Sequence, residues 1–170
     1  RDACARYGAH IVAIPRDSLL VLSDENGDAL FNAESKWEAV TPLSKHDGAK
    51  IAILALGATA GIAQHAAEQL SGTADVYVVN GLPLPDGFLD GIFGQYDGVV
   101  TVEDGIIGTR CTGVRGFAGL VLSAASNSGT KTEHIGIVDP RIAPSEGHAE
   151  VWAHFGLTSG AIIDAAKSLA

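Results

Sequence analysis

Three short stretches carry residue types that could bind a ligand or take part in catalysis. Gly57-Ala-Thr-Ala-Gly61 directly follows an apolar run, and a glycine turn between a strand and a helix can bind an anion through free backbone amides. Val102-Glu-Asp-Gly105 places two carboxylates side by side, as a general acid–base pair or a metal site would require. Arg16 follows Pro15, and a guanidinium can bind a phosphate or a carboxylate through two parallel hydrogen bonds.

Each of these stretches also has a purely structural interpretation. The glycine turn lacks the G-x-G-x-x-G spacing, and Asn80 after the next apolar run offers no carboxylate for a ribose, so packing is favoured over dinucleotide binding. Glu103 and Asp104 would point in opposite directions on an extended chain, which favours a capping and turn role. Arg16 could equally pair with Asp17 or face solvent, and spacing does not separate these alternatives.

The histidines and cysteines form no recognisable site in the sequence. His65 and Glu68 share one face of a predicted helix, which indicates a surface pair, and the six histidines show no H-E-x-x-H spacing. Cys4 and Cys111 are too far apart for a metal-ligand pair and too few for a disulfide framework, so we expect two buried thiols in a reducing, cytoplasmic setting. No nucleophile motif such as G-x-S-x-G is present, so the sequence predicts no catalytic residue and no metal ligand.

Length and composition limit the possible class of protein. A chain of 170 residues with 46% hydrophobic residues and 21 glycines fits one α/β domain that buries about 70% of its surface. Eleven basic against 20 acidic residues give a net charge of −9, which argues against nucleic acid as a partner. No apolar run approaches the length of a membrane span, so we expect no membrane association. The chain has no Met, and we expect it to be a piece of something longer.

The elements that must position these residues follow from the apolar pattern. Lys50–Leu70 is an apolar run, a glycine turn and a helical stretch, and it is the βα unit around which the chain is organised. The alternation continues to the end of the chain and predicts a mostly parallel sheet with helices on both faces. The predicted strands cover residues 50–56, 76–80, 98–103 and 134–138, and the predicted helices cover about 59–70, 86–96, 114–126, 148–155 and 159–169.

The first 48 residues fit this alternation poorly. Residues 2–7 could end a helix that stops at Gly8, and His10–Ile14 has the pattern of a buried strand that stops at Pro15. Residues 16–48 are polar and rich in turn residues, with a short strand predicted only at Trp37–Val40. We therefore expect residues 1–15 to be the tail of a preceding domain, residues 16–48 to be a linker with a short edge strand, and residues 49–170 to be the main domain.

The order of several short motifs resembles the carboxy-terminal part of the transketolase family of thiamine-diphosphate enzymes. That family includes transketolase, deoxyxylulose-phosphate synthase and the beta chain of 2-oxoacid dehydrogenase first components. The resemblance covers nearly the whole chain and rests on the order and spacing of the motifs taken together. The motifs are Val12-Ala-Ile-Pro-Arg16, Trp37-Glu-Ala-Val40, Lys50-Ile-Ala-Ile-Leu-Ala-Leu-Gly57, Asn80-Gly-Leu-Pro-Leu-Pro85, Val99-Val-Thr-Val-Glu-Asp-Gly105, Gly136-Ile-Val-Asp139 and Phe155-Gly-Leu-Thr158.

This resemblance implies a fold, a role and one substrate contact. The fold would be a three-layer α/β domain with a mostly parallel sheet, helices on both faces and an antiparallel edge strand. Thiamine diphosphate and a divalent metal would be bound outside this chain, by a cofactor-binding domain and a pyrimidine-binding domain or subunit, and residues 1–15 would be the tail of the latter. The chain would then be the structural, dimer-forming part of a transferase, inactive alone, with Arg16 contacting the phosphate of a sugar-phosphate substrate.

One stretch departs from the family pattern, and two other functions remain open. Gly108-Thr-Arg-Cys-Thr-Gly-Val-Arg-Gly116 replaces the G-G-x-G-S turn that usually opens the following helix, so the subfamily is open. The first alternative is a Rossmann-like nucleotide-binding protein that uses Gly57–Gly61. The second is a docking module, the role that this domain has when a dehydrogenase beta chain holds an acyltransferase core.

Overall fold

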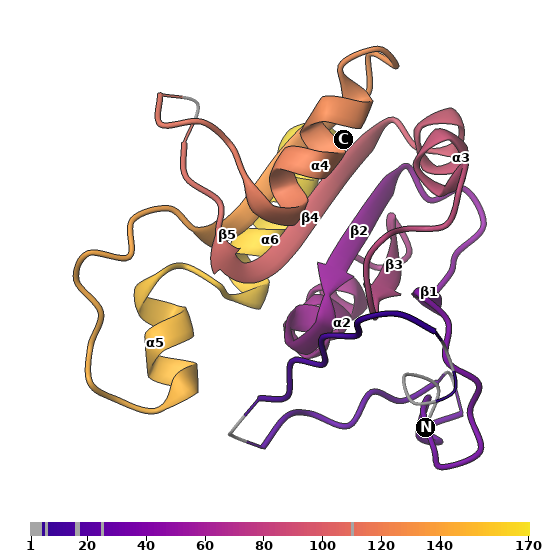
Figure 1. The fold of residues 1–170 in the computed structure, drawn as a ribbon. Coiled ribbons are helices and arrows are strands. Elements are labelled where there is room, and N and C mark those ends of the chain that lie inside the picture. Colours follow the sequence, from indigo (N-terminus) through magenta and orange to yellow (C-terminus); the bar gives the residue numbers. More distant parts are fainter. Residues whose placement is uncertain (1–4, 6, 16–17, 25, 110) are drawn as a thin grey trace.

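The structure of this chain, a computed structural model, contains one five-stranded sheet (Figure 1). It describes residues 5, 7–15, 18–24, 26–109 and 111–170. The strand order is β1-β3-β2-β4-β5, in which β1 pairs antiparallel to β3 and every other neighbouring pair is parallel. The strands are β1 (Val40–Ser44), β2 (Ile51–Leu56), β3 (Ala74–Val79), β4 (Gly98–Ile106) and β5 (Lys131–Ile137).

Helices cover both faces of the sheet and complete a three-layer α/β fold. The helices are the 3₁₀ turn η1 (Gly57–Thr59), α2 (Ala60–Gln69), α3 (Phe88–Gln95), α4 (Gly116–Ala125), α5 (His148–His154) and α6 (Ser159–Leu169). Buried alanines of α2 and the apolar side of α6 pack on one face of the sheet. Residues of α3 and α4 pack on the other face, around Leu54 and Phe117. The predicted fold class is confirmed, including the antiparallel edge strand.

The predicted helices and parallel strands are confirmed with small shifts at their ends. The strand predicted at 76–80 begins earlier, at Ala74, because the buried Asp75 belongs to β3 and not to the preceding turn. The strand predicted at 134–138 begins at Lys131, where exposed and partly buried residues alternate as an edge strand requires. No helix of the part of the chain that the structure describes is long and apolar enough to cross a membrane.

The edge strand was predicted too early in the chain. It was expected at Trp37–Val40 and lies at Val40–Ser44, so the two ranges share one residue. Pro42 weakens the strand signal in the sequence, yet an edge strand tolerates proline because one side of its backbone has no ladder to maintain. The β1–β3 register is irregular between Pro42 and Ser44, as expected at such a position.

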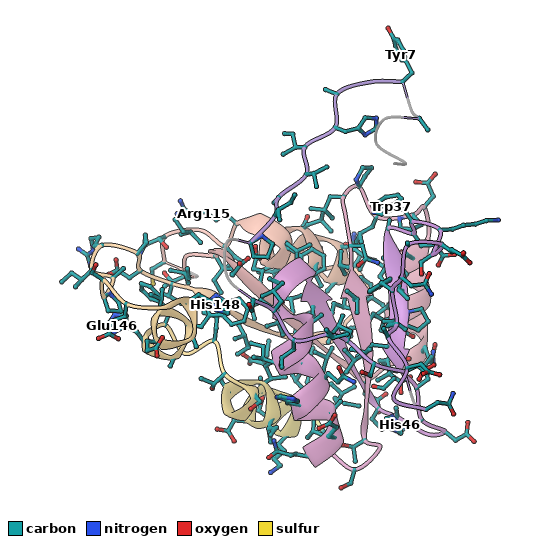
Figure 2. The ribbon with its side chains drawn as sticks, turned by 90° about the horizontal axis from the view of Figure 1, so that it is seen from below. Tyr7, Trp37, His46, Arg115, Glu146 and His148 are labelled. Carbon is teal, nitrogen blue, oxygen red and sulfur yellow. The ribbon has the colours of Figure 1, made fainter. Side chains whose placement is uncertain are left out.

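The prediction of a buried strand at His10–Ile14 was wrong. These residues form no strand, and Ile11, Val12 and Ile14 are 98%, 66% and 81% exposed. Tyr7 stands clear of the body of the protein in Figure 2. Within the described residues, residues 10–14 pair with no strand of the sheet, so their apolar pattern lacks the neighbouring strands that would bury it. The helix end expected at residues 2–7 falls largely outside the described residues.

Candidate functional site

The carboxyl ends of β2 and β4 mark the point where the connections leave the sheet in opposite directions. β2 and β4 are neighbours, the chain after β2 returns through β3 on one side, and the chain after β4 returns through β5 on the other. In open α/β sheets such a switch point usually forms the ligand crevice. Two of the three sequence candidates, the glycine turn and Glu103–Asp104, were expected at this edge, whereas the third, Arg16, was expected at an interdomain crevice and lies outside the described residues.

The glycine turn is used for packing. Gly57 has a φ of +56°, which favours glycine, and it opens η1. A methyl group at Gly61 would lie 3.1 Å from Leu20 Cβ, so Leu20 packs directly on this helix start. The Thr59 hydroxyl is fully buried and donates to the carbonyl oxygen of Val102 at 2.9 Å, which ties the turn to β4 across the switch point. These contacts agree with the packing interpretation made from the sequence.

Glu103 and Asp104 do not share a site. Glu103 is buried, and its Oε1 accepts a 2.7 Å hydrogen bond from the backbone amide of Ala118 in the first turn of α4. A negative charge at a helix N-terminus is stabilised both by free amides and by the helix dipole. Asp104 is exposed. The capping role predicted for this pair is observed for Glu103, whose carboxylate lies at the α4 N-terminus.

A crevice of about 1070 Å³ lies at the carboxyl ends of β2 and β3. The linker forms one wall, because Asn80 Nδ2 donates to Glu38 O at 3.1 Å and to Thr41 Oγ1 at 3.0 Å, and the Trp37 ring packs against Gly81. Residues 9–15 line another part of it. The lining residues are Ala9–Pro15, Ser35, Trp37, Leu56–Ala58, Val79–Leu82 and Asp104.

A second polar group, which was not predicted from the sequence, lies at the opposite, amino edge of the sheet. Asp75 is completely buried, and it accepts hydrogen bonds from the backbone amide of His46 at 2.7 Å and from the Tyr96 hydroxyl at 2.6 Å. Lys45 Nζ lies 3.7 Å from Asp75 Oδ2 and donates to Tyr77 Oη at 2.8 Å. The hydroxyls of Tyr77 and Tyr96 are 2.7 Å apart. We call these five residues the Asp75 network; it joins the linker, β3 and the end of α3.

We interpret the Asp75 network as structural, because Asp75 is completely buried and its carboxylate accepts hydrogen bonds from His46 and Tyr96, which come from different parts of the chain. Burial, followed by the hydrogen bond to the Asp75 carboxylate, raises the pKa of Tyr96 well above its usual value. The hydrogen bond to Tyr77 raises the pKa of Lys45. Both shifts favour the protonated forms, which donate hydrogen bonds within the network.

These two pKa shifts predict a loss of stability at alkaline pH. In the unfolded chain Tyr96 loses its proton near pH 10, whereas the folded chain keeps it. The contribution of Tyr96 is therefore complete below about pH 10 and decreases as the pH rises beyond it. Urea unfolding at about pH 8 and about pH 11 measures the change, and Tyr96→Phe should show a smaller loss than wild type. An equal loss in the variant would contradict this assignment.

The remaining predicted residues do not converge on one site. Arg16 and Cys4 lie outside the described residues. Cys111 is exposed, so the prediction that it is buried was wrong; it sits in the turn before α4 and not in the core. His65 and Glu68 are both exposed on α2, as predicted. Among the described residues, no group of three or more His, Cys, Asp or Glu side chains could hold a metal ion.

Comparisons with known proteins find similarity in structure and not in sequence. No family model and no curated protein matches the sequence. A chain of a split-gene transketolase, described as an inactive beta4 tetramer, superposes with a TM-score of 0.68 at 20% identity and covers 82% of this chain and 45% of its own. Transketolase from Campylobacter jejuni gives a TM-score of 0.54 at 15% identity, covering 83% of this chain and 20% of its own.

A third solved structure agrees with these two. Transketolase from Leishmania mexicana gives a TM-score of 0.52 at 15% identity and covers 77% of this chain and 18% of its own. This chain therefore spans less than half the length of each of the three. At these identities the similarity concerns the fold. The resemblance predicted from the order of the motifs is thus confirmed at the level of fold, and the chain has the α/β fold found within transketolases.

Proposed function

We propose that this chain is the carboxy-terminal, structural domain of a thiamine-diphosphate-dependent, transketolase-like enzyme that acts on sugar phosphates. The observation that carries the proposal is the fold match over 82% of this chain to less than half of a split-gene transketolase chain. Thiamine diphosphate and its divalent metal would be bound by a cofactor-binding domain and a pyrimidine-binding domain or subunit, and not by this chain. The assembled enzyme would be a cytoplasmic homodimer.

The exposed amino-terminal segment supports this division into domains. Ile11, Val12 and Ile14 are apolar and exposed on an extended chain, and this is how a strand of a two-sided sheet looks without its neighbours. We therefore assign residues 1–15 to the tail of a pyrimidine-binding-type domain, residues 16–48 to the linker and residues 49–170 to the carboxy-terminal domain. In that arrangement the preceding domain would cover the crevice that residues 9–15 line.

The chain by itself is expected to be inactive. At the switch point, where an α/β enzyme usually binds its ligand, Thr59 is bonded to β4 and Glu103 caps α4. The split-gene transketolase chain that it resembles is itself described as an inactive beta4 tetramer. The role that these features favour is to pack against other domains and against a second copy.

Arg16 is the one residue of this chain to which we assign a substrate contact, with the substrate phosphate. In the assembled enzyme, Arg16→Ala should lower kcat/KM for a phosphorylated ketose by about 10- to 100-fold, because a charged hydrogen bond to a phosphate contributes about 1.5–3 kcal/mol. Arg16→Lys should recover part of the loss, since it keeps the charge but not the paired geometry. Steady-state kinetics with phosphorylated and unphosphorylated ketoses measures the effect.

The control for Arg16 is Arg115→Ala, an exposed arginine before α4 that donates to the carbonyl oxygen of Thr112. It should leave kcat/KM within about twofold of wild type, as surface substitutions usually do. An Arg16→Ala enzyme that lost activity equally with phosphorylated and unphosphorylated substrates would contradict a phosphate contact.

A ligand titration tests the proposal against the two alternatives. The melting temperature of the chain should not change with thiamine diphosphate and Mg²⁺, nor with NAD(P) or ATP, because a ligand raises it only by binding the folded state. A shift with NAD(P) or ATP would favour the nucleotide-binding alternative, and a shift with thiamine diphosphate would contradict a non-catalytic domain. Retention of an acyltransferase core in a pull-down with purified components would favour the docking module.

A further inference from the structure

β5 is the open edge of the sheet opposite to β1. Among the strands of the described chain, it has β4 on one side and none on the other. An open edge presents unpaired backbone groups that can accept another strand, and natural proteins usually cover or charge such an edge. β5 carries two charges, Lys131 and Glu133, both exposed.

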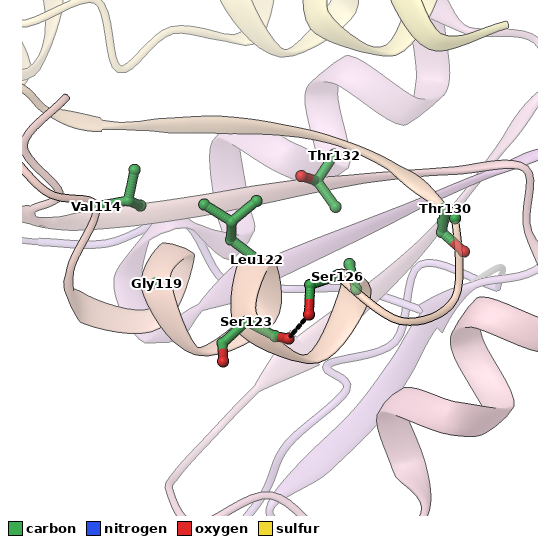
Figure 3. Close-up of a pocket in the computed structure, with 9 residues that line it drawn as sticks. Val114, Gly119, Leu122, Ser123, Ser126, Thr130 and Thr132 are labelled. Atoms are coloured by element: carbon green, nitrogen blue, oxygen red, sulfur yellow. Dashed lines mark hydrogen bonds between the residues drawn. The ribbon is translucent and has the colours of Figure 1, made fainter. Parts of the chain in front are cut away.

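The side chains of β5 divide between the two helical layers. Ile135 packs with the cluster that contains Ile162 and Ala166 of α6. Because side chains alternate between the two faces of a strand, Lys131 and Glu133, four and two residues before Ile135, lie on the same α6 face. Thr130 and Thr132 lie on the α4 face, where they line a shallow groove beside α4 (Figure 3). Lys131 and Glu133, next to this edge, are exposed to solvent.

We propose that two copies of this chain associate through β5, with the two strands paired antiparallel about Thr132 so that their sheets become one. In such a two-fold pairing, each residue lies opposite the residue at the mirror position about the centre. Lys131 then lies opposite Glu133 of the second copy, and the same pair recurs on the other side of the axis. Thr132 faces itself and Thr130 faces His134.

Charge selects this register over its neighbours. Centring the pair on Glu133 would place Lys131 opposite Ile135, and centring it on Lys131 would place Glu133 opposite Gly129. Only pairing about Thr132 matches both charges, and cross-strand opposite charges stabilise a sheet whereas like charges destabilise it. The charges that would keep a foreign strand away from the edge therefore fit a second copy of this chain.

The α4 layer also fits a second copy. α4 packs over β4 and β5, so two paired copies would bring their α4 helices about two strand spacings, or about 10 Å, apart, which is a usual distance between packed helices. The outer side of α4 carries Gly119, Leu122, Ser123 and Ser126, which line a groove of about 750 Å³. Ser126 folds back to the carbonyl oxygen of Ser123, as the dashed line in Figure 3 shows. Apart from Leu122, these residues are small and leave room for the partner's helix.

Sedimentation equilibrium of the 170-residue chain tests this surface. The wild-type chain should form dimers, and Lys131→Glu or Glu133→Lys should each raise the dissociation constant about tenfold or more, because two attractive pairs become repulsive. An equimolar mixture of the two variants should form a heterodimer of near wild-type affinity, since every cross-strand pair is then opposite in charge. Lys36→Glu, in the exposed linker, makes the same change of charge as Lys131→Glu and should have no effect.

The proposed β5 pairing rests on the proposed function only for its role in the assembled enzyme. The experiment distinguishes a failure of the β5 pairing from a failure of the proposed function. A monomeric wild-type chain, or variants that do not recover on mixing, would overturn the β5 surface. If both charge variants dimerise with the dissociation constant of wild type, the β5 surface is also wrong. That result would still be compatible with a dimeric, transketolase-like domain. Far-UV circular dichroism of each variant shows that its fold is unchanged.

Discussion

Replacing Asp75 by Ala is expected to lower the free energy of unfolding by about 3–5 kcal/mol, a large part of the total stability of a domain of this size. Asp75 is completely buried and accepts hydrogen bonds from the His46 amide and the Tyr96 hydroxyl. Its removal leaves both donors without their acceptor and Lys45 without its ion partner. Urea denaturation followed by circular dichroism measures the loss.

A matched control is available at the same edge of the sheet. Asp97 pairs with Lys50 at 3.4 Å, and these side chains are 68% and 67% exposed. Because exposed ion pairs contribute little, Asp97→Ala should change the free energy of unfolding by less than about 1 kcal/mol. Equal effects of Asp75→Ala and Asp97→Ala would mean that the Asp75 network does not hold the linker to the sheet.

The second large effect is expected at Glu103. Glu103→Ala should cost about 2–4 kcal/mol, because it removes the charged acceptor from the Ala118 amide and empties the space behind α4. Glu103→Gln keeps an acceptor of the same length and should cost about 1 kcal/mol, mainly the lost interaction with the helix dipole. Unfolding free energies of both variants test this difference.

The neighbouring acid supplies the control, and activity separates a structural from a catalytic role. Asp104 is exposed, so Asp104→Ala should be within about 0.5 kcal/mol of wild type. If Glu103 only caps α4, the assembled enzyme with Glu103→Gln should turn over substrate at close to the wild-type rate. A stable Glu103→Gln enzyme whose turnover rate fell by about two orders of magnitude or more would contradict the capping interpretation.

Local patterns predicted most of the fold. The apolar run 50–56 followed by a glycine turn gives β2, η1 and α2 nearly as expected, because burial on both faces leaves a strong signal in the sequence. β1 was predicted three residues too early, since an edge strand has only one neighbour and tolerates Pro42. Residues 10–14 have a strand pattern but no neighbouring strand, and a local pattern does not reveal where a neighbour lies.

The polar groups were harder to predict than the elements. Glu103 gave a partial signal: adjacent acids on an extended chain point in opposite directions, which favoured a capping role, but the helix that Glu103 caps begins only at Gly116. No local pattern showed that the members of the Asp75 network would meet. They lie in three stretches of the chain, about 20 to 30 residues apart, which come together only once β1, β3 and α3 are assembled. These stretches contain Lys45 and His46, Asp75 and Tyr77, and Tyr96. The signal that could have been used is a lone Asp inside an otherwise apolar strand, which must have buried partners.

The proposed function is tested most directly by a ketol-transfer assay on this chain, alone and mixed with a polypeptide that carries the cofactor-binding and pyrimidine-binding domains from the same organism. Thiamine diphosphate, Mg²⁺, a ketose phosphate and an aldose phosphate are present in both samples. We predict no turnover by the chain alone and thiamine-diphosphate-dependent turnover in the mixture. Turnover by the chain alone, or a mixture no more active than the added polypeptide, would contradict a structural domain of a transketolase-like enzyme.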